Sequence, residues 1–362
     1  MFSKKQANLN SVIEHFKKKM CTDRYPNVVG GIIGFIKVLG EGSFGKVFKA
    51  CYPLKTVYQH VKKKKVLFLF TTSNVRYEPV CYPDALIIAV KVQPIEEENI
   101  QFISSNLYEK MISKSSIWCE YAVLKASSLL VKHKICPFFC SYVNIALCEK
   151  DHQSFLFMNY QDGSLHDYLQ QVKITEELLF SIFVQVLIAL YSLYANFEIV
   201  HNDLHSGNIL YHTIPKEDCL GWEFRWREGK FIVPNEGILF VLSDFGLAAR
   251  KEVFYNPMLK IKFRSSNFPR VFRKKNMDLL YFLYLFRDVI EESIVLDAFI
   301  ESTLYVLKVK PNDDITIEDY GNILQRLLDH PLLKTFWLSS KNSSVYCFDL
   351  NKRITDELFI EK

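Results

Sequence analysis

The nine cysteines include no C-x-x-C pair, and no apolar leader with a cleavage site stands at the start of the chain. Paired cysteines are typical of zinc ribbons and redox sites, and a leader would indicate secretion. Without either, we expect reduced thiols in a cytoplasmic or nuclear setting. One cluster raises the question of zinc: His133, Cys136, Cys140 and Cys148. Its spacing matches no common zinc template, so we favour buried thiols that pack as small hydrophobic groups.

Low-complexity disorder is excluded by the composition, which is 49% hydrophobic and 23% charged over 362 residues. A soluble chain of this length can bury a large core and has room for about two domains. The formal net charge of +5 favours anionic partners only weakly, so local charge clusters matter more than the sum.

Two motifs predict the chemistry: H-N-D-L-H-S-G-N at residues 201–208 and S-D-F-G at residues 243–246. Phosphoryl transfer needs hard oxygen ligands for Mg²⁺ and a carboxylate near the acceptor hydroxyl. The two motifs resemble the protein-kinase pattern, which implies that Asp203 would accept the hydroxyl proton and that Asn208 and Asp244 would bind the metal. Each motif alone is common. Their joint spacing indicates a phosphotransfer site.

A glycine-rich segment, G-x-G-x-x-G-x-V, spans residues 40–47. Glycines let a hairpin backbone approach phosphates without a Cβ clash. Such a motif could equally open a dinucleotide-binding helix, but the K-V-F-K-A that follows indicates a strand and favours the hairpin. The expected nucleotide contacts are Gly40, Gly42, Ser43, Phe44, Gly45 and Val47, with Val47 over the adenine.

Lys91 lies in the apolar run 87–92, where an unpaired ammonium would be costly. It therefore needs a carboxylate partner. Glu120 opens an apolar helical repeat and is the partner that we favour, and Glu109 is the competitor.

Together these motifs resemble the protein kinase superfamily over about residues 35–340. They are similar to divergent members such as haspin and the serine/threonine kinases of large DNA viruses. The resemblance implies an α+β, two-lobed fold with a small β-rich N-lobe and a mainly helical C-lobe. Its parts would be an N-terminal extension at 1–30, an N-lobe at 31–158 with an insert at 51–86, and a C-lobe at 159–362. A viral origin would extend the expected location to the host cell or the virion.

The resemblance also assigns roles to residues outside the two loop motifs, and it implies ATP and Mg²⁺ as cofactors. Lys91 would bind the α- and β-phosphates and act with Asp203 and Asn208 in catalysis, and Asp278 would brace the catalytic-loop backbone. The remaining expected nucleotide contacts are Ala89 on the lysine strand, Glu120, the gatekeeper Met158, and the hinge residues Asn159 and Gln161.

The stretch Leu178–Ala195 is almost wholly apolar and about as long as a membrane span. A span would separate the hinge from Asp203 on opposite sides of a bilayer. We therefore expect no membrane span but a buried helix, with Thr175 as its N-cap.

Two basic regions have several interpretations. The insert carries Lys62–Lys65 and could be a docking hairpin for an acidic partner, a nucleic-acid or membrane contact, or an exposed excursion. Nine Lys and Arg residues between positions 250 and 275 suggest acidic peptide substrates, a nucleic-acid contact or a solvated loop. The protein is expected to be a monomer.

The sequence departs from the family pattern at three places. Asn202 replaces the arginine of H-R-D and cannot clamp a phosphorylated loop as a guanidinium does, so activity without loop phosphorylation is expected. His205 replaces the usual lysine, and no A-P-E motif follows Asp244.

Three functions therefore stay in view. The favoured one is an active serine/threonine protein kinase. The alternatives are a small-molecule kinase of the choline or aminoglycoside type, and a nucleotide-binding pseudokinase scaffold.

Overall fold

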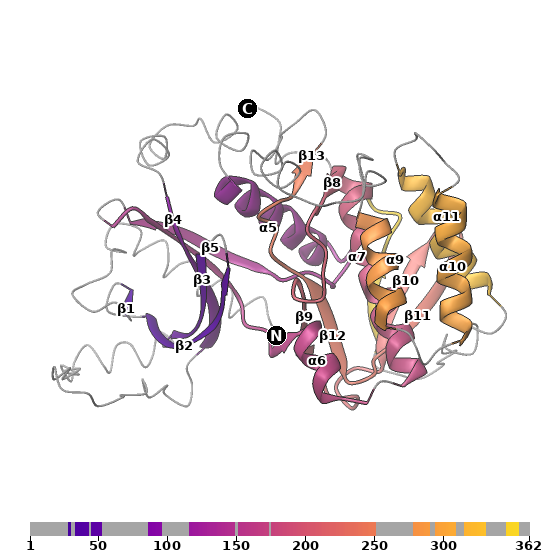
Figure 1. The fold of residues 1–362 in the computed structure, drawn as a ribbon, viewed down its shortest axis with the longest axis horizontal. Helices are drawn as coiled ribbons and strands as arrows, with labels where there is room; N and C mark the ends of the chain where they lie inside the picture. Colours follow the sequence, from indigo (N-terminus) through magenta and orange to yellow (C-terminus); the bar gives the residue numbers. More distant parts are fainter. Residues whose placement is uncertain are drawn as a thin grey trace. The chain divides into compact units, whose positions relative to one another are not determined.

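The computed structural model describes residues 28–29, 33–42, 45–52, 86–95, 116–148, 151–173, 175–250, 278–289, 294–308, 315–330 and 345–354. The chain forms two compact units (Figure 1). Unit 1 comprises Met1–Tyr108 and Tyr142–Tyr160, and unit 2 comprises Glu109–Ser141 and Gln161–Lys362. Helix α5 (Ser116–Lys132) belongs to unit 2, although it lies within the range 31–158.

Unit 1 is built on an antiparallel sheet in the order β1-β2-β3-β4-β6-β5. The strand predicted from K-V-F-K-A is confirmed, because these residues lie in β3, which pairs with β2 as a hairpin. The strands are β1 (Val28–Val29), β2 (Ile33–Gly42), β3 (Gly45–Tyr52), β4 (Leu86–Pro94), β5 (Tyr142–Cys148) and β6 (Gln153–Asn159).

The core of unit 2 is helix α7 (Glu176–Phe197), which packs against α5, α9 and α11. Its N-cap is Thr175, as predicted, since the Thr175 side chain accepts a hydrogen bond from Leu178 N at 3.3 Å. By length and composition α7 could cross a membrane, but 89% of its most apolar window is buried inside the protein. The interpretation as a buried core helix is confirmed.

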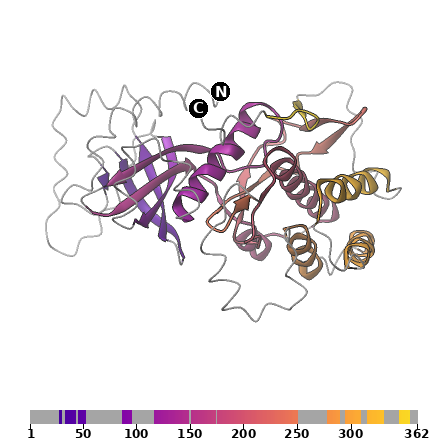
Figure 2. The same cartoon turned by 90° about the horizontal axis from the view of Figure 1, so that it is seen from above.

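Aromatic rings fasten α7 to its neighbours. Phe183 lies 4.6 Å and 5.3 Å, between ring centroids, from Phe282 and Phe286 of α9, and 6.2 Å from Phe299 of α10. Figure 2 views the helices of unit 2 from above. The other helices are α6 (Leu165–Gln171), α9 (Asp278–Val289), α10 (Ile294–Lys308) and α11 (Ile317–Asp329).

Unit 2 also contains three small sheets, with the orders β12-β9-β7, β13-β8 and β11-β10-β14. The sequence predicts a mainly helical unit here and does not predict these sheets. Trp222 of β10 and Trp226 at its end are buried, so both rings pack inside the protein. The strands are β7 (Gly163–Ser164), β8 (Ile199–Val200), β9 (Ile209–Thr213), β10 (Gly221–Trp226), β11 (Gly229–Pro234), β12 (Ile238–Leu242), β13 (Ala249–Arg250) and β14 (Val345–Asp349).

The thiols of the zinc question behave as packing groups. Cys136 and Cys140 are buried, whereas His133 is exposed. Within the described ranges no three His, Cys, Asp or Glu side chains come together as metal ligands. Cys148 is disulfide-bonded, so the expectation of reduced thiols is wrong at this position.

We expect the buried thiols to resist alkylation in the native protein. Burial raises the pKa values of Cys119, Cys136 and Cys140 to about 12, so almost no thiolate exists at neutral pH. Cys347 is exposed and serves as the internal control. N-ethylmaleimide at neutral pH followed by peptide mass mapping should modify Cys347 first and the buried three only after denaturation. Rapid native labelling of Cys136 would contradict the burial.

Some predicted residues lie outside the described part of the chain. They are Ser43 and Phe44 of the glycine segment, Glu109, Lys62–Lys65 of the insert, and the basic residues 251–275.

Candidate active site

The catalytic loop leaves β8 and enters β9, and a buried carboxylate holds its first residues. The backbone N–H groups of His201 and Asn202 both donate to Asp278 at the start of α9, the second at 2.8 Å. Asp278 is 2% exposed. Charge-assisted bonds of this kind are strong where water is excluded. The predicted bracing role of Asp278 is confirmed.

His201 connects the two motifs through its ring. Asp203 N donates to His201 Nδ1 at 3.3 Å, so Nε2 carries the proton and donates to Ser243 O at 2.9 Å. The ring is fully buried and lies 5.0 Å, between centroids, from the ring of Phe245. His201 therefore serves as a structural link between the catalytic loop and the S-D-F-G segment.

Asn208 joins the proposed base to the proposed metal ligands. Its Nδ2 donates to Asp203 O at 2.9 Å, which leaves Oδ1 as the acceptor oxygen of the side chain. Ser243 donates to Asn208 O from both N and Oγ, each at 3.0 Å. Asp244 is the next residue. The three sequence-predicted residues Asp203, Asn208 and Asp244 are thus brought to one place.

This donor set fits magnesium. Mg²⁺ prefers oxygen ligands, and the site offers the Asn208 amide oxygen and the Asp244 carboxylate. Asp244 has a φ of 54°, a left-handed conformation that aspartate tolerates better than most residues. Gly246 N donates to Asp244 Oδ1 at 3.4 Å, which helps to orient the carboxylate.

Asn202 has its own structural role. Its φ is 62°, and its side-chain Nδ2 donates to Leu247 O at 3.3 Å and to Val200 O at 3.4 Å. The amide therefore ties the segment after Asp244 to the catalytic loop without any phosphate group.

Strand β12, which leads into Asp244, is held by hydrogen bonds from polar residues of the apolar helix α7. Phe240 N of β12 donates to Gln185 Oε1 at 2.8 Å, and Gln185 Nε2 donates to Ile238 O at 3.3 Å. Ser181 donates to Pro234 O at 3.3 Å. A buried amide in an apolar helix would be costly without such partners, so Gln185 is explained by the strand that it holds.

Tyr281 is a site residue that sequence reasoning missed. Burial and the negative charges of Asp278 and Asp203 raise the pKa of its phenol to about 12. Tyr281 therefore lies within electrostatic reach of the proposed base. The sequence did contain a clue to this role: Tyr281 follows Asp278 by one helical turn, so the two side chains are neighbours on the surface of α9.

In unit 1, strand register puts the candidate nucleotide contacts on one face of the sheet. Val47 is opposite Lys91, and Ala89 is opposite Met158. Directly opposite residues share a face, and so do residues two apart. The other face carries the hydrophobic core, including Ile88, Val90, Phe155 and Phe157. The four candidates therefore face away from the core of their own unit.

The glycine segment has a second physical reason for one of its glycines. A Cβ on Gly45 would lie 2.2 Å from Val92 O, and Gly45 has a φ of 142°. Glycine is required there by the approach of β3 to β4. At Gly40 a Cβ would meet nothing within 4 Å, so local packing sets no such requirement. Gly42 is opposite Gly45 in the β2–β3 pair.

The other candidates lie in the two units as follows. Glu120 is on α5 in unit 2 and is 1% exposed. Asn159 ends β6 and is opposite Ile88. The Gln161 side chain hydrogen-bonds the Cys140 sulfur, while its Oε1 is buried and has no hydrogen-bond partner among the described residues.

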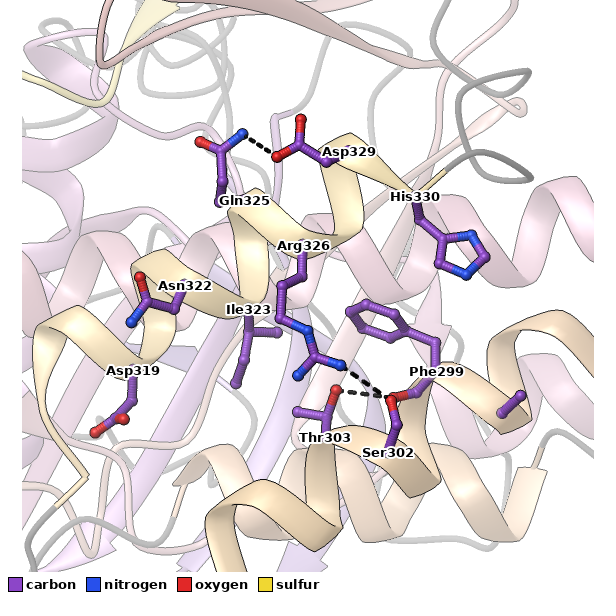
Figure 3. A pocket seen from close by; sticks show the side chains of 11 residues that line it. Phe299, Ser302, Thr303, Asp319, Asn322, Ile323, Gln325, Arg326, Asp329 and His330 are labelled. Carbon is purple, nitrogen blue, oxygen red and sulfur yellow. Dashed lines mark hydrogen bonds between the residues drawn. The ribbon is translucent and has the colours of Figure 1, made fainter.

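A separate cavity of about 890 Å³ lies between α10 and α11 and contains none of the predicted residues (Figure 3). Four of its polar side chains hydrogen-bond one another in two pairs. Arg326 Nη2 donates to Ser302 Oγ at 3.1 Å, and Gln325 Nε2 donates to Asp329 Oδ2 at 2.8 Å. We assign no chemistry to it.

Residues 93–258 match the family model described as a protein kinase domain. No curated protein matches the chain. The matched range contains Glu120 and both loop motifs and begins just after Lys91. Together with the helices and antiparallel sheets, the match supports an α+β kinase fold and phosphotransfer as the general activity, which relates this chain to the protein kinase superfamily.

Proposed function

We propose that the protein transfers the γ-phosphate of ATP, with Mg²⁺, to serine or threonine hydroxyls of protein substrates. The proposal rests on the hydrogen-bond network that joins Asp203, Asn208 and Ser243. Asp278 holds the start of the same loop by accepting from its backbone. Such preorganised carboxylate and amide groups are what phosphoryl transfer asks of a protein.

The roles follow from the chemistry of each side chain. Asp203 would accept the proton of the attacking hydroxyl. Asn208 and Asp244 would hold Mg²⁺, which neutralises charge on the phosphates when bound. In unit 1, the ammonium of Lys91 would bind phosphate oxygens, with Glu120 as its proposed carboxylate partner. Backbone groups of Asn159 to Gln161 would hydrogen-bond the adenine edge.

The test is transfer of radiolabelled phosphate from ATP and Mg²⁺ to the protein itself, to casein and to a basic protein. Label that is lost in Asp203→Ala supports a protein kinase, and preference for casein supports acidic substrates. Nucleotide binding without protein labelling would overturn the proposal. A screen of amino alcohols and aminoglycosides would then separate a small-molecule kinase from a scaffold.

We further expect activity without phosphorylation of the segment after Asp244. In the arginine-containing pattern a guanidinium clamps a phosphorylated loop, whereas Asn202 already binds Leu247 O directly. Phosphatase treatment, verified by intact-mass measurement, should leave kcat within about two-fold, which corresponds to less than about 0.5 kcal/mol. Inactivation of the wild-type enzyme by phosphatase would refute this expectation.

A further inference from the structure

The last described strand of the chain pairs with a hairpin that lies between the two motifs. β10 and β11 form this hairpin, which is inserted between β9 and β12. β14 pairs with β10 in parallel, with Trp222 opposite Tyr346 and Phe224 opposite Phe348. The hairpin that follows the catalytic loop therefore gains its third strand, β14, from the far end of the described chain.

Four aromatic side chains connect this sheet to the loop after α5, and we name them the aromatic brace: Phe138, Trp222, Phe224 and Phe348. Phe138 lies 5.4 Å from Trp222 and 5.7 Å from Phe224, between ring centroids. Phe224 stacks on Phe348 at 5.5 Å. Phe138 and Phe224 have no exposed surface, so these contacts are well shielded from water.

The same loop holds the end of the strand that leads into Asp244. Leu242 N donates to Phe138 O at 3.1 Å, and Cys140 N donates to Leu242 O at 2.9 Å. Leu242 is two residues before Asp244. The aromatic brace therefore continues, through backbone hydrogen bonds, to Leu242, two residues before the proposed magnesium ligand.

Hydrogen bonds fix the C-terminal segment to this assembly. Asp349 N donates to Lys134 O at 2.9 Å, in the loop after α5. Asn351 bonds Arg227 reciprocally: Arg227 N donates to Asn351 Oδ1 at 2.7 Å, and Asn351 Nδ2 donates to Arg227 O at 3.0 Å. β14 is thus joined both to the hairpin and to the loop that continues the Glu120 helix.

We propose that β14 is a positioning element for the metal site and that Phe348 is its positioning residue. Phe348 fixes Phe224 and hence Phe138, and Phe138 O holds Leu242 so that Asp244 keeps its place beside Asn208. The inference rests on the proposed function, because it takes Asp244 as a magnesium ligand.

The test compares Phe348→Ala with Tyr346→Ala, which removes a ring that is 58% exposed on the same strand. The Mg²⁺ concentration for half-maximal phosphotransfer should rise about ten-fold in Phe348→Ala, the lower end of effects seen when supporting groups of metal ligands are removed. It should stay unchanged in Tyr346→Ala. A lowered melting temperature with an unchanged Mg²⁺ requirement would overturn the proposal, since it would show a purely structural role.

Hydrogen–deuterium exchange provides a readout that does not need activity. Peptides over residues 137–141 and 239–245 should exchange faster in Phe348→Ala and not in Tyr346→Ala. If Phe348→Ala does not fold, Phe348→Leu and Asn351→Ala are measured instead. Unchanged exchange in both would reject the brace. If the wild type is inactive but the same peptides still exchange faster in Phe348→Ala than in the wild type, the proposed function is rejected and the brace is kept.

Discussion

Replacing Asp203 with asparagine is expected to lower kcat for phosphotransfer by roughly two to four orders of magnitude, with little change in KM for ATP. The amide has nearly the shape of the carboxylate but cannot accept the hydroxyl proton. Two hydrogen bonds that hold the loop use the backbone of this residue: Asp203 N donates to His201 Nδ1, and Asp203 O accepts from Asn208 Nδ2. Both survive the substitution.

Initial rates at saturating ATP and Mg²⁺, with thermal melting of each variant, measure this effect. Asp218→Asn is the matched control, since it changes an exposed aspartate of the same unit and should leave kcat unaltered. A variant at Asp203 that keeps a tenth or more of the wild-type kcat would exclude this carboxylate as the base. A variant with a much lower melting temperature would instead point to a scaffolding role.

The parts of the site that could be predicted from the sequence are those encoded by short motifs. Asp203, Asn208 and Asp244 follow from residue types at fixed spacing, because the loop geometry that phosphotransfer needs is local. Asp278 was also predictable, since the resemblance supplied its role. The apolar run of α7 and its N-cap Thr175 follow from helix physics alone.

Long-range pairing left no comparable signal. The parallel register of β14 with β10 joins segments about 124 residues apart, and neither strand differs in composition from an ordinary exposed or half-buried strand. Gln185 likewise resembled a chance polar interruption until the position of β12 was known. Its partner is a backbone N–H group, which every residue except proline has, so the sequence does not mark it.

The glycine motif has a second steric reason that the sequence alone did not predict. The glycine motif was interpreted through approach to phosphates, but Gly45 is required by contact with Val92 O within unit 1. A substitution at Gly45 therefore strains the sheet whether or not nucleotide is bound. A glycine motif indicates that another group lies close to the backbone, but only the fold shows which group it is.

Replacing Asp278 with alanine is expected to destabilise the protein strongly, because it removes the acceptor of two buried N–H groups. These are the backbone N–H groups of His201 and Asn202. Bonds to a charged acceptor contribute about 1.5–3 kcal/mol each, so the expected loss is about 3–6 kcal/mol, against typical total stabilities of about 5–15 kcal/mol. Asp278→Asn keeps one acceptor oxygen and should lose about half as much.

Urea unfolding of Asp278→Ala, Asp278→Asn and the exposed control Asp297→Ala measures these differences in the free energy of unfolding. Catalysis should fall further than stability, because Asp203 directly follows the two braced residues and loses its fixed position even in molecules that stay folded. At a temperature where Asp278→Asn is fully folded, its kcat should therefore be reduced while its KM for ATP is retained. Wild-type stability in Asp278→Ala would show that other groups satisfy these N–H donors. The catalytic loop would then owe its conformation to other contacts, among them those of the His201, Asn202 and Asn208 side chains.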